Sequence, residues 1–367
     1  MMVNTNPLDR LRLRMQSAGE KAQQIKDFGV FDFDHVPDQP LLRKEADQLM
    51  DELVNFKVTG IPTHHFIVGS RGSGKTLTLR FLERLFTAEA KLKFHYANCR
   101  QHNTSFKILT HLLGLPPRGL ALGEVFDMFE CQATEGTVVL LDELELMSPK
   151  DSGMEILYLL SRSKKRFMVV ALSNTARPLR ELDAATRSSL QPVPLYFPHY
   201  DAEQIKTILQ ERARQGLHRW DSGQLEEIAA LTVKRSNSDA RVAIKTLFYA
   251  VTHPSRPLEE NFECARKNVV IDMIADLPET ALVVLWAAAT ANNEFAKEVY
   301  ARYRRFCQGR SEKPVSYVCF CANLSYLQSA GLVTLLATQV GRAYPNRVML
   351  TADTSTVEQI FRMRLGA

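Results

Sequence analysis

The chain has 367 residues, of which 45% are hydrophobic and 24% are charged, and its formal net charge is +5. This composition is typical of an ordinary globular protein, and the length allows two or three domains. The longest apolar stretches, such as residues 280–291, are too short to cross a bilayer, and the N-terminus lacks the apolar run of a signal peptide. We therefore expect a protein of the cytoplasm or nucleoid that does not bind membranes.

Cysteine spacing and charge distribution narrow the class further. The six cysteines form no Cys-x-x-Cys pair, which argues against a disulfide framework or a structural zinc site. Residues 278–367 contain ten Lys/Arg against six Asp/Glu, so +4 of the net charge lies in the last quarter. An anionic partner for that quarter and a mildly basic solvated surface are equally good interpretations.

The first half of the chain alternates short apolar runs with helical patterns. Residues 1–28 are polar and predict an arm or an amphipathic helix. The apolar runs predict strands at 66–69, 93–97, 137–141 and 166–172. The helical patterns lie at 76–86, 104–113, 123–133 and 153–163. Strands that alternate with helices indicate an α/β fold with a parallel sheet covered on both faces.

The second half reads differently. Pro192, Pro194 and Pro198 mark the end of the α/β region. Beyond them only helices are predicted, at 202–215, 222–231 and 240–252, before a second break at 253–257. After Pro278, three helical patterns precede an alternating pair at 332–336 and 347–350. Three helices followed by a β-hairpin are typical of a winged helix.

A phosphate-binding motif lies between the first predicted strand and its helix. Gly69-Ser-Arg-Gly-Ser-Gly-Lys-Thr76 matches G-x-x-x-x-G-K-[ST], in which glycines allow backbone N–H groups to wrap phosphates. Lys75 would neutralise the β/γ oxygens, and the Thr76 hydroxyl would bind Mg²⁺. The predicted ATP/ADP contacts are Gly69, Ser70, Arg71, Gly72, Ser73, Gly74, Lys75, Thr76 and Leu77.

Two later strands end in polar residues. Val138-Val-Leu-Leu-Asp-Glu143 delivers Asp142 to the magnesium and Glu143 to the attacking water, where a carboxylate orients water for in-line attack. Taken alone, such an acidic pair is often a helix N-cap. The strand at 167–172 ends in Ser173-Asn174, and Asn174 is either a sensor of the γ-phosphate or a plain strand terminator.

Together these residues resemble a family, the AAA+ initiators of the origin recognition complex and Cdc type, closest to the archaeal single-chain form. The resemblance covers the chain from about residue 31 to its end. It rests on the order of short stretches: Val36-Pro37 with Arg43, Tyr96-Ala-Asn-Cys-Arg100, Asp142-Glu-Leu-Glu145, Leu157-Tyr-Leu-Leu-Ser-Arg162, Leu172-Ser-Asn174, Arg187-Ser-Ser-Leu190, Phe197-Pro-His-Tyr200, Ser238-Asp-Ala-Arg241 and Leu324–Val333.

The resemblance implies roles and boundaries. Asn174 would be the first sensor, and Arg241 would reach the γ-phosphate from a helical lid. Val36, Pro37 and Arg43 would lie near the adenine. The implied segments are an N-terminal arm at 1–30, an AAA+ base at 31–198, a lid at 199–277 and a winged helix at 278–367. The implied protein is an ATP-dependent initiator of DNA replication and weak ATPase that binds double-stranded DNA. A replicative helicase and further copies of the chain would be its other partners.

The sequence departs from the family at two places. Ala185 stands where the family has an arginine, so activation across a subunit interface would fall to Arg187 or Arg180. The predicted recognition helix, residues 315–329, carries no Lys or Arg. Base readout would then rest on hydrogen-bonding side chains, and the wing would add two arginines. These predicted DNA contacts are Ser316, Tyr317, Asn323, Tyr326, Arg342 and Arg347.

Two other functions fit the same motifs. One is an AAA+ ATPase that selects target DNA for a mobile element. The other is a signalling ATPase whose winged helix binds protein. Absence of salt-dependent DNA binding would favour the second.

Overall fold

The structure, a computed structural model, describes residues 24–148, 151, 154–291, 293–339 and 345–366. Most of the arm predicted at 1–28 and the predicted wing residue Arg342 lie outside these ranges. Within them, no helix is long and apolar enough to cross a membrane.

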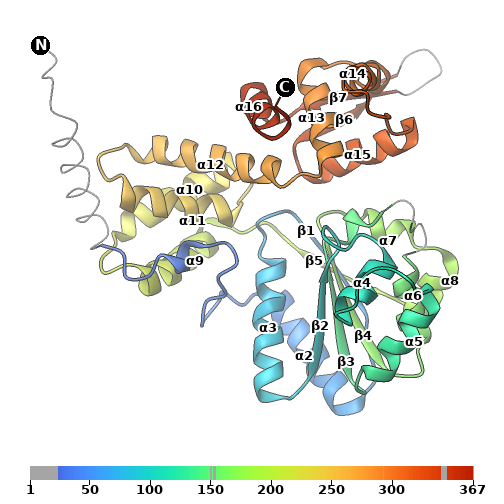
Figure 1. The fold of residues 1–367 in the computed structure, drawn as a ribbon. Helices are drawn as coiled ribbons and strands as arrows, with labels where there is room; N and C mark the ends of the chain where they lie inside the picture. The colour runs from blue at the N-terminus through green and yellow to red at the C-terminus, as the bar shows by residue number, and fades with distance from the viewer. Residues whose placement is uncertain (1–23, 149–150, 152–153, 292, 340–344, 367) are drawn as a thin grey trace, which may run out of the picture. The chain divides into compact units, whose positions relative to one another are not determined.

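A five-stranded sheet contains all four predicted strands (Figure 1). These are β1 (His65–Gly69), β2 (Lys93–Asn98), β3 (Thr137–Asp142) and β4 (Phe167–Ser173). The strand order is β2-β3-β4-β1-β5, and β2, β3, β4 and β1 pair in parallel. Every residue of β3 and β4 is buried, which explains why both read as continuous apolar runs rather than alternating ones.

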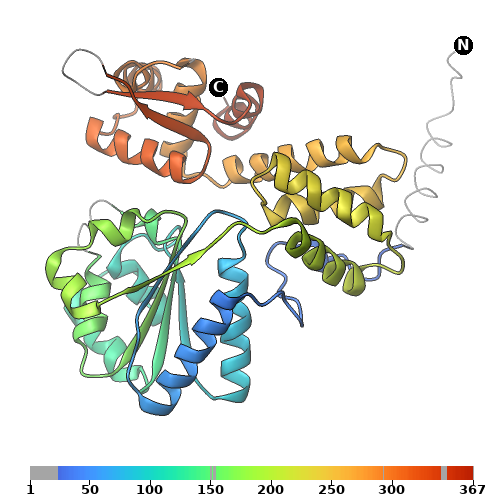
Figure 2. The same ribbon diagram turned by 180° about the vertical axis from the view of Figure 1, so that it is seen from behind.

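The fifth strand, β5 (Val193–Phe197), lies at the edge of the sheet where the sequence predicted only a break (Figure 2). The Val193 N–H donates to the His64 carbonyl at 2.8 Å. Because successive backbone N–H groups of a strand point to opposite edges, the position of the missing N–H at Pro194 is on the side away from β1, where no neighbouring strand needs it. Proline argues against a central strand but not against an edge strand, and the prediction was wrong for this reason.

Helices cover the sheet, and those of one layer bury a common apolar core. The layer contains α4 (Ser105–Leu112), α5 (Leu122–Gln132), α6 (Glu155–Arg162) and α8 (Ala184–Leu190). Thr104 caps α4 by accepting from the Lys107 N–H at 3.3 Å. At the core, the rings of Phe129 and Phe167 stack 5.5 Å apart. The chain up to β5 further contains α2 (Lys44–Thr59), α3 (Lys75–Glu89), α7 (Arg177–Glu181) and the 3-10 turns η1 (Gly29–Phe31) and η2 (Leu144–Leu146).

The chain divides into two compact units. The first comprises Met1–Met50, Ser70–Leu85 and Phe197–Val269, and the second comprises Asp51–Gly69, Phe86–Tyr196 and Val270–Ala367. The first therefore contains the phosphate loop and the helices that follow β5, and the second contains almost the whole sheet and the C-terminal elements. The domain boundaries implied by the resemblance stay predictions.

In the first unit, aspartates begin each of three successive helices. Asp201, Asp221 and Asp239 accept backbone N–H groups at the starts of α9 (Ala202–Gly216), α10 (Ser222–Arg235) and α11 (Ala240–Thr252). The three predicted helices are thus confirmed, and α12 (Leu258–Ala275) follows them unpredicted. Arg212 of α9 is 2% exposed and donates to the His35 carbonyl at 2.9 Å and to the Val30 carbonyl. Burial lowers its pKa to about 10. This arginine fixes the N-terminal segment against the helices.

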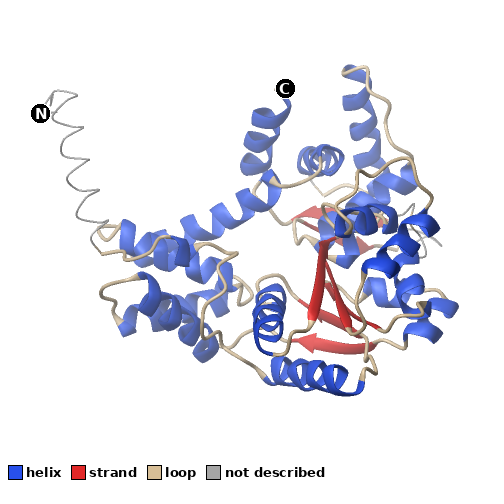
Figure 3. Ribbon diagram, turned by 60° about the horizontal axis from the view of Figure 1, so that its bottom comes forward, coloured by secondary structure: helices blue, strands red, loops and turns tan. Residues whose placement is uncertain are grey.

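The C-terminal elements match the predicted outline of three helices and a hairpin (Figure 3). They are α13 (Glu279–Ala291), α14 (Ala296–Gly309), α15 (Tyr317–Ser329) and the antiparallel pair β6 (Val333–Ala337) and β7 (Asn346–Leu350). A further helix, α16 (Thr354–Leu365), was not predicted. Asp353 caps it, and its Phe361 stacks on Trp286 of α13 at 4.7 Å.

The pKa of His64, the residue just before β1, predicts how the free energy of unfolding depends on pH. The Val169 N–H donates to His64 Nδ1 at 3.1 Å, which requires a neutral ring. Burial and the neighbouring His65 lower the pKa of His64 from 6.5 to about 4. A folded-state pKa below the unfolded value means that this contribution is complete above pH 6.5 and is lost as the pH falls toward 4.

We expect the His64 contribution to lower the free energy of unfolding by about 3 kcal/mol between pH 7 and pH 4. The measurement is urea unfolding across that range. His64→Asn keeps an acceptor oxygen for Val169 but does not titrate, so its stability should depend less steeply on pH. An equal slope in the variant would show that His64 is not the group responsible.

Candidate nucleotide site and nucleic-acid interface

The carboxyl ends of four parallel strands bring Asp142, Glu143 and Asn174 to one edge of the sheet, whereas Lys75 and Arg241 belong to the first compact unit. In the register, Asn98 ending β2 lies opposite Asp142 ending β3. Val68 of β1 lies opposite Ser173 of β4, so Asn174 follows at the level of Gly69. The chain therefore leaves β1 for the phosphate loop at the same edge at which Asp142 and Asn174 leave the sheet.

The loop that follows β1 has a shape that requires glycine. Gly72 and Gly74 have φ of +71° and +83°, in the left-handed region that other residues rarely adopt. A Cβ at Gly74 would lie 1.9 Å from the Tyr200 hydroxyl oxygen. Lys75, 7% exposed, donates from Nζ to the Ser70 carbonyl at 2.8 Å. With α3 beginning at Lys75, the loop offers the N–H groups of a helix N-terminus to an anion.

The Arg43 side chain hydrogen-bonds to the backbone of this loop. Its guanidinium donates to the Ser73 carbonyl at 2.7 Å and to the Pro198 carbonyl at 2.9 Å. It also lies 4.9 Å from the centre of the Phe197 ring and 4.4 Å from that of Tyr200. The structure thus places Arg43, which is 8% exposed, against the loop backbone.

The two other residues implied near the adenine lie in the segment held by Arg212. Pro37 is buried and its carbonyl accepts from Arg84 Nη2 of α3 at 3.1 Å, while Val36 is half-buried. The contacts of both with adenine stay predictions.

Arg241 lies in the first turn of α11 and pairs with Asp239. Its Nη2 donates to Asp239 Oδ2 at 2.6 Å and its Nε to Oδ1 at 3.0 Å. Asp239 in turn lies against the phosphate loop, because a Cβ at Gly72 would be 2.0 Å from its Oδ1. The helix that carries the implied second sensor therefore begins directly beside the loop.

The acidic pair after β3 is held by neighbours from β2. Asp142 is buried, and its Oδ2 accepts from the Tyr96 hydroxyl at 3.1 Å. Glu143 has φ of +53° and forms a bidentate ion pair with Arg100, at 2.9 Å and 3.0 Å. Burial works against the charge of the Arg100 guanidinium, but the Glu143 carboxylate outweighs this and raises the pKa of Arg100. In this state the Glu143 carboxylate is neutralised rather than directed at water.

Asn174 is held in the same way. Its Nδ2 donates to Glu145 Oε1 at 2.5 Å, and its N–H donates to Oε2 at 3.2 Å. Burial, followed by Asp142 and Glu145, raises the pKa of the Cys99 thiol well above its ordinary value. The edge is thus rich in carboxylates and suits a cation better than an anion.

Residues close to the predicted site were missed as participants. Tyr96, Arg100, Glu145 and Asp239 appeared only within stretches that carried the resemblance. A usable signal existed for Arg100, because it follows a strand that ends at the same edge as Asp142. No sequence spacing indicates that the Tyr200 hydroxyl meets Gly74.

The arginines that could replace the one absent at Ala185 lie on α7 and α8. Arg187 Nη2 donates to the carbonyls of Leu179 and Arg180 at 2.9 Å and 3.2 Å, and so ties the two helices together. The Arg180 side chain is exposed. A role for either across a subunit interface stays a prediction.

The residues predicted to contact DNA bases at and within α15 differ in solvent exposure. Ser316 is exposed and caps the helix, and Tyr317 is 39% exposed. Asn323 donates from Nδ2 to the Cys319 carbonyl of its own helix at 2.9 Å. Tyr326 is half-buried. In the wing, the Arg347 guanidinium lies over the Phe295 ring at 4.8 Å.

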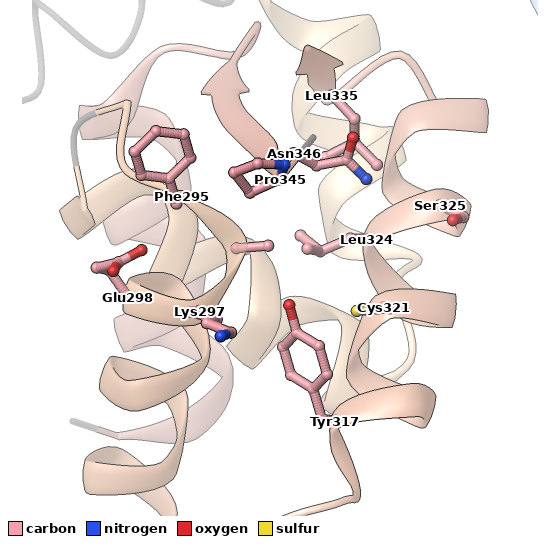
Figure 4. Close-up of a pocket in the computed structure, with 11 residues that line it drawn as sticks. Phe295, Lys297, Glu298, Tyr317, Cys321, Leu324, Ser325, Leu335, Pro345 and Asn346 are labelled. Atoms are coloured by element: carbon pink, nitrogen blue, oxygen red, sulfur yellow. The ribbon is translucent and has the colours of Figure 1, made fainter. Parts of the chain in front are cut away.

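A cavity of about 500 Å³ lies between the start of α14, helix α15 and the hairpin. Figure 4 shows the Tyr317 ring pointing into it, with Phe295, Leu324, Leu335 and Pro345 among its lining. Its mainly apolar wall does not suit a phosphate. Cations are instead found on α14, where Lys297, Arg304 and Arg305 are exposed, whereas Arg302 pairs with Glu294 at 2.8 Å.

A glycine loop between β1 and α3, an acidic pair at the end of β3 and an asparagine directly after β4 define a P-loop protein of the AAA+ class, with a helical lid and a winged helix. No protein-family model matches the chain. The ORC1-type DNA replication protein 1 of Archaeoglobus fulgidus is 27% identical over 372 residues, which cover 91% of this chain and 90% of that protein. The chain belongs to the archaeal ORC1/Cdc6-type replication initiators.

Solved structures agree with this assignment. The Aeropyrum pernix ORC1 protein in complex with DNA has a TM-score of 0.72 at 25% identity and covers 93% of this chain and 97% of its own. The Aeropyrum pernix ORC2 protein in its ADPNP–ADP complexes has a TM-score of 0.58 at 24% identity, covering 94% of this chain and 100% of its own. At that identity the second likeness supports the fold alone.

The Arg100–Glu143 pair predicts that freeing the carboxylate speeds ATP hydrolysis. Arg100→Gln removes the bidentate partner, so Glu143 can turn to water without breaking an ion pair. We expect a several-fold higher rate of phosphate release at saturating ATP. Arg118→Gln, at an exposed arginine, is the control and should leave the rate unchanged. A lower rate in Arg100→Gln would show that Arg100 contributes to hydrolysis rather than restraining it.

Proposed function

We propose that this initiator is an ATP-controlled switch that binds double-stranded DNA at replication origins and hydrolyses ATP slowly to reset. The single observation that carries the proposal is the register of the parallel strands, which end at one edge of the sheet: there Gly69 opens the phosphate-loop motif, Asp142 ends β3 and Asn174 follows β4. We further propose, from the resemblance, that it recruits a replicative helicase and associates with other copies on DNA.

In the proposed site each residue has one role. Backbone N–H groups from Ser70 to Thr76 hold the phosphates, and Lys75 leaves the Ser70 carbonyl to meet the β/γ oxygens. Thr76 and Asp142 would hold Mg²⁺, which commonly takes only one or two protein oxygens besides phosphate and water. Bound ATP supplies the γ-phosphoryl group. Glu143 orients the attacking water, and Asn174 and Arg241 contact the γ-phosphate.

The DNA contact we propose is mainly electrostatic. The exposed Arg304 and Arg305 lie on the helix that precedes α15. In helix-turn-helix folds this first helix crosses the backbone, where arginines contact phosphates without reading sequence. We expect Ser316 and Tyr317, at the start of α15 and exposed, to contact base edges.

Three observations favour a second candidate, a winged helix that binds protein. The recognition helix has no cation, its Val318 is 78% exposed, and the adjacent cavity is apolar. DNA-binding measurements distinguish the two candidates.

The nucleotide roles predict different outcomes for two substitutions. Lys75→Ala should abolish ATP binding, because the loop loses its fixed charge on the phosphates. Glu143→Gln should keep ATP bound while turnover falls about 100-fold or more, since only the group that orients water changes. Binding is measured by calorimetry and turnover by phosphate release. Lys93→Ala, at an exposed lysine of β2, is the control. Wild-type turnover in Glu143→Gln would contradict the role of that residue.

The DNA contact predicts a change in salt dependence. Replacing both Arg304 and Arg305 with Gln should weaken binding to every duplex alike. It should also make the slope of log K against log salt shallower by about 1.8, at roughly 0.9 for each phosphate contact. Fluorescence anisotropy across a salt series measures both. Arg362→Gln, at an exposed arginine of α16, serves as the control. An unchanged slope in the double variant would favour the protein-binding candidate.

A further inference from the structure

We propose that Asp239 is a positioning residue, which holds the Arg241 guanidinium so that its far side meets the third phosphate of the nucleotide. The inference rests on the proposed role of Arg241, and it assigns to Asp239 the ability of the site to distinguish ATP from ADP.

The geometry of the pair supports an orienting role. Asp239 Oδ1 accepts from both the Arg241 backbone N–H and Nε, each at 3.0 Å, and Oδ2 accepts from Nη2 at 2.6 Å. One carboxylate therefore fixes the backbone and the side chain of the same arginine. It occupies the Nε–Nη2 side of the planar fork, so the Nη1 side faces away from Asp239. Because a guanidinium carries five N–H donors, it can bind a second anion without releasing the first.

The position of the pair beside the phosphate loop supports the same role. The Ala240 N–H donates to the Gly72 carbonyl at 3.3 Å, and a Cβ at Gly72 would lie 3.0 Å from the Asp239 Cα. The start of α11 thus rests on the loop backbone. The side chains of Arg241 and Asp239 are only 27% and 15% exposed, so both are restricted by their surroundings.

The charge of Asp239 separates positioning from a purely structural role. A carboxylate beside a phosphate site opposes every nucleotide, and pairing with Arg241 cancels that opposition. Removing the charge should therefore leave ADP affinity unchanged or higher. Losing the orientation of Arg241 should weaken only the contact to the third phosphate. The ratio of ATP to ADP affinity, rather than affinity itself, reports the role.

The variant that isolates this effect is Asp239→Asn. Asparagine caps a helix as well as aspartate does, so α11 keeps its N-terminal acceptor while the bidentate ion pair is lost. Asp239→Ser, which also retains a capping oxygen, is the second variant. Asp221→Asn is the matched control, because Asp221 caps α10 by accepting from the Gly223 N–H at 2.9 Å.

The experiment is calorimetric titration of the full chain with the non-hydrolysable analogue ADPNP and with ADP. It compares wild type, Asp239→Asn, Arg241→Ala and the double variant, with melting temperatures confirming the fold. We expect Asp239→Asn to lower the ADPNP/ADP affinity ratio about fivefold or more, by losing a charge-assisted contact. The double variant should match Arg241→Ala, because Asp239 acts through Arg241.

Three results would overturn the proposal in distinguishable ways. If Arg241→Ala lowers the ratio but Asp239→Asn and Asp239→Ser do not, Asp239 does not position the arginine. If Arg241→Ala leaves the ratio unchanged, the proposed role of Arg241 itself is wrong and the inference fails with it. Equal loss of affinity for both nucleotides in Asp239→Asn would assign the residue to the loop structure alone.

Discussion

The parallel register of β2, β3, β4 and β1 is the constraint on which the candidate site depends. Parallel strands all end at one edge, so the polar residue that follows each strand arrives beside the others without any long-range interaction to place it. β3 and β4 are buried throughout, and a shift of one residue would turn every side chain to the opposite face. Burial therefore fixes the register, and the register fixes where Asp142 and Asn174 lie.

Three polar side chains, at the carboxyl edge of the sheet and beside the phosphate loop, are each hydrogen-bonded to a neighbouring charged side chain. Glu143 is held by Arg100, Asn174 by Glu145, and Arg241 by Asp239. A partly buried charge is costly without such a partner, and these pairs keep the site stable before a nucleotide arrives. On the proposed roles, nucleotide binding would exchange the partners of Glu143 and Asn174, whereas Arg241 would keep its contact with Asp239. This is a physical basis for coupling occupancy to conformation.

The sequence predicted the elements whose signals are local. The phosphate loop is a continuous motif, and β3 and β4 are apolar runs, so both could be recognised. Arg100 could not be paired with Glu143 in advance, because that contact depends on how β2 lies beside β3. The proline in β5 was read as a break, since sequence alone does not show which strand is outermost. Arg43 was implied near the adenine by resemblance, but its place between two aromatic rings required the fold.

Pro194 also bears on how copies of the chain can meet. An exposed strand edge is a template on which a second sheet can grow, leading to shared sheets or fibrils. On β5, Val193 points its N–H toward β1, so the outward donor expected at the next residue is the one that proline lacks. Pro194 therefore weakens intermolecular β-pairing at that edge by removing one outward donor. Any association of copies of this chain along β5 would then depend more on side chains than on a continuous sheet.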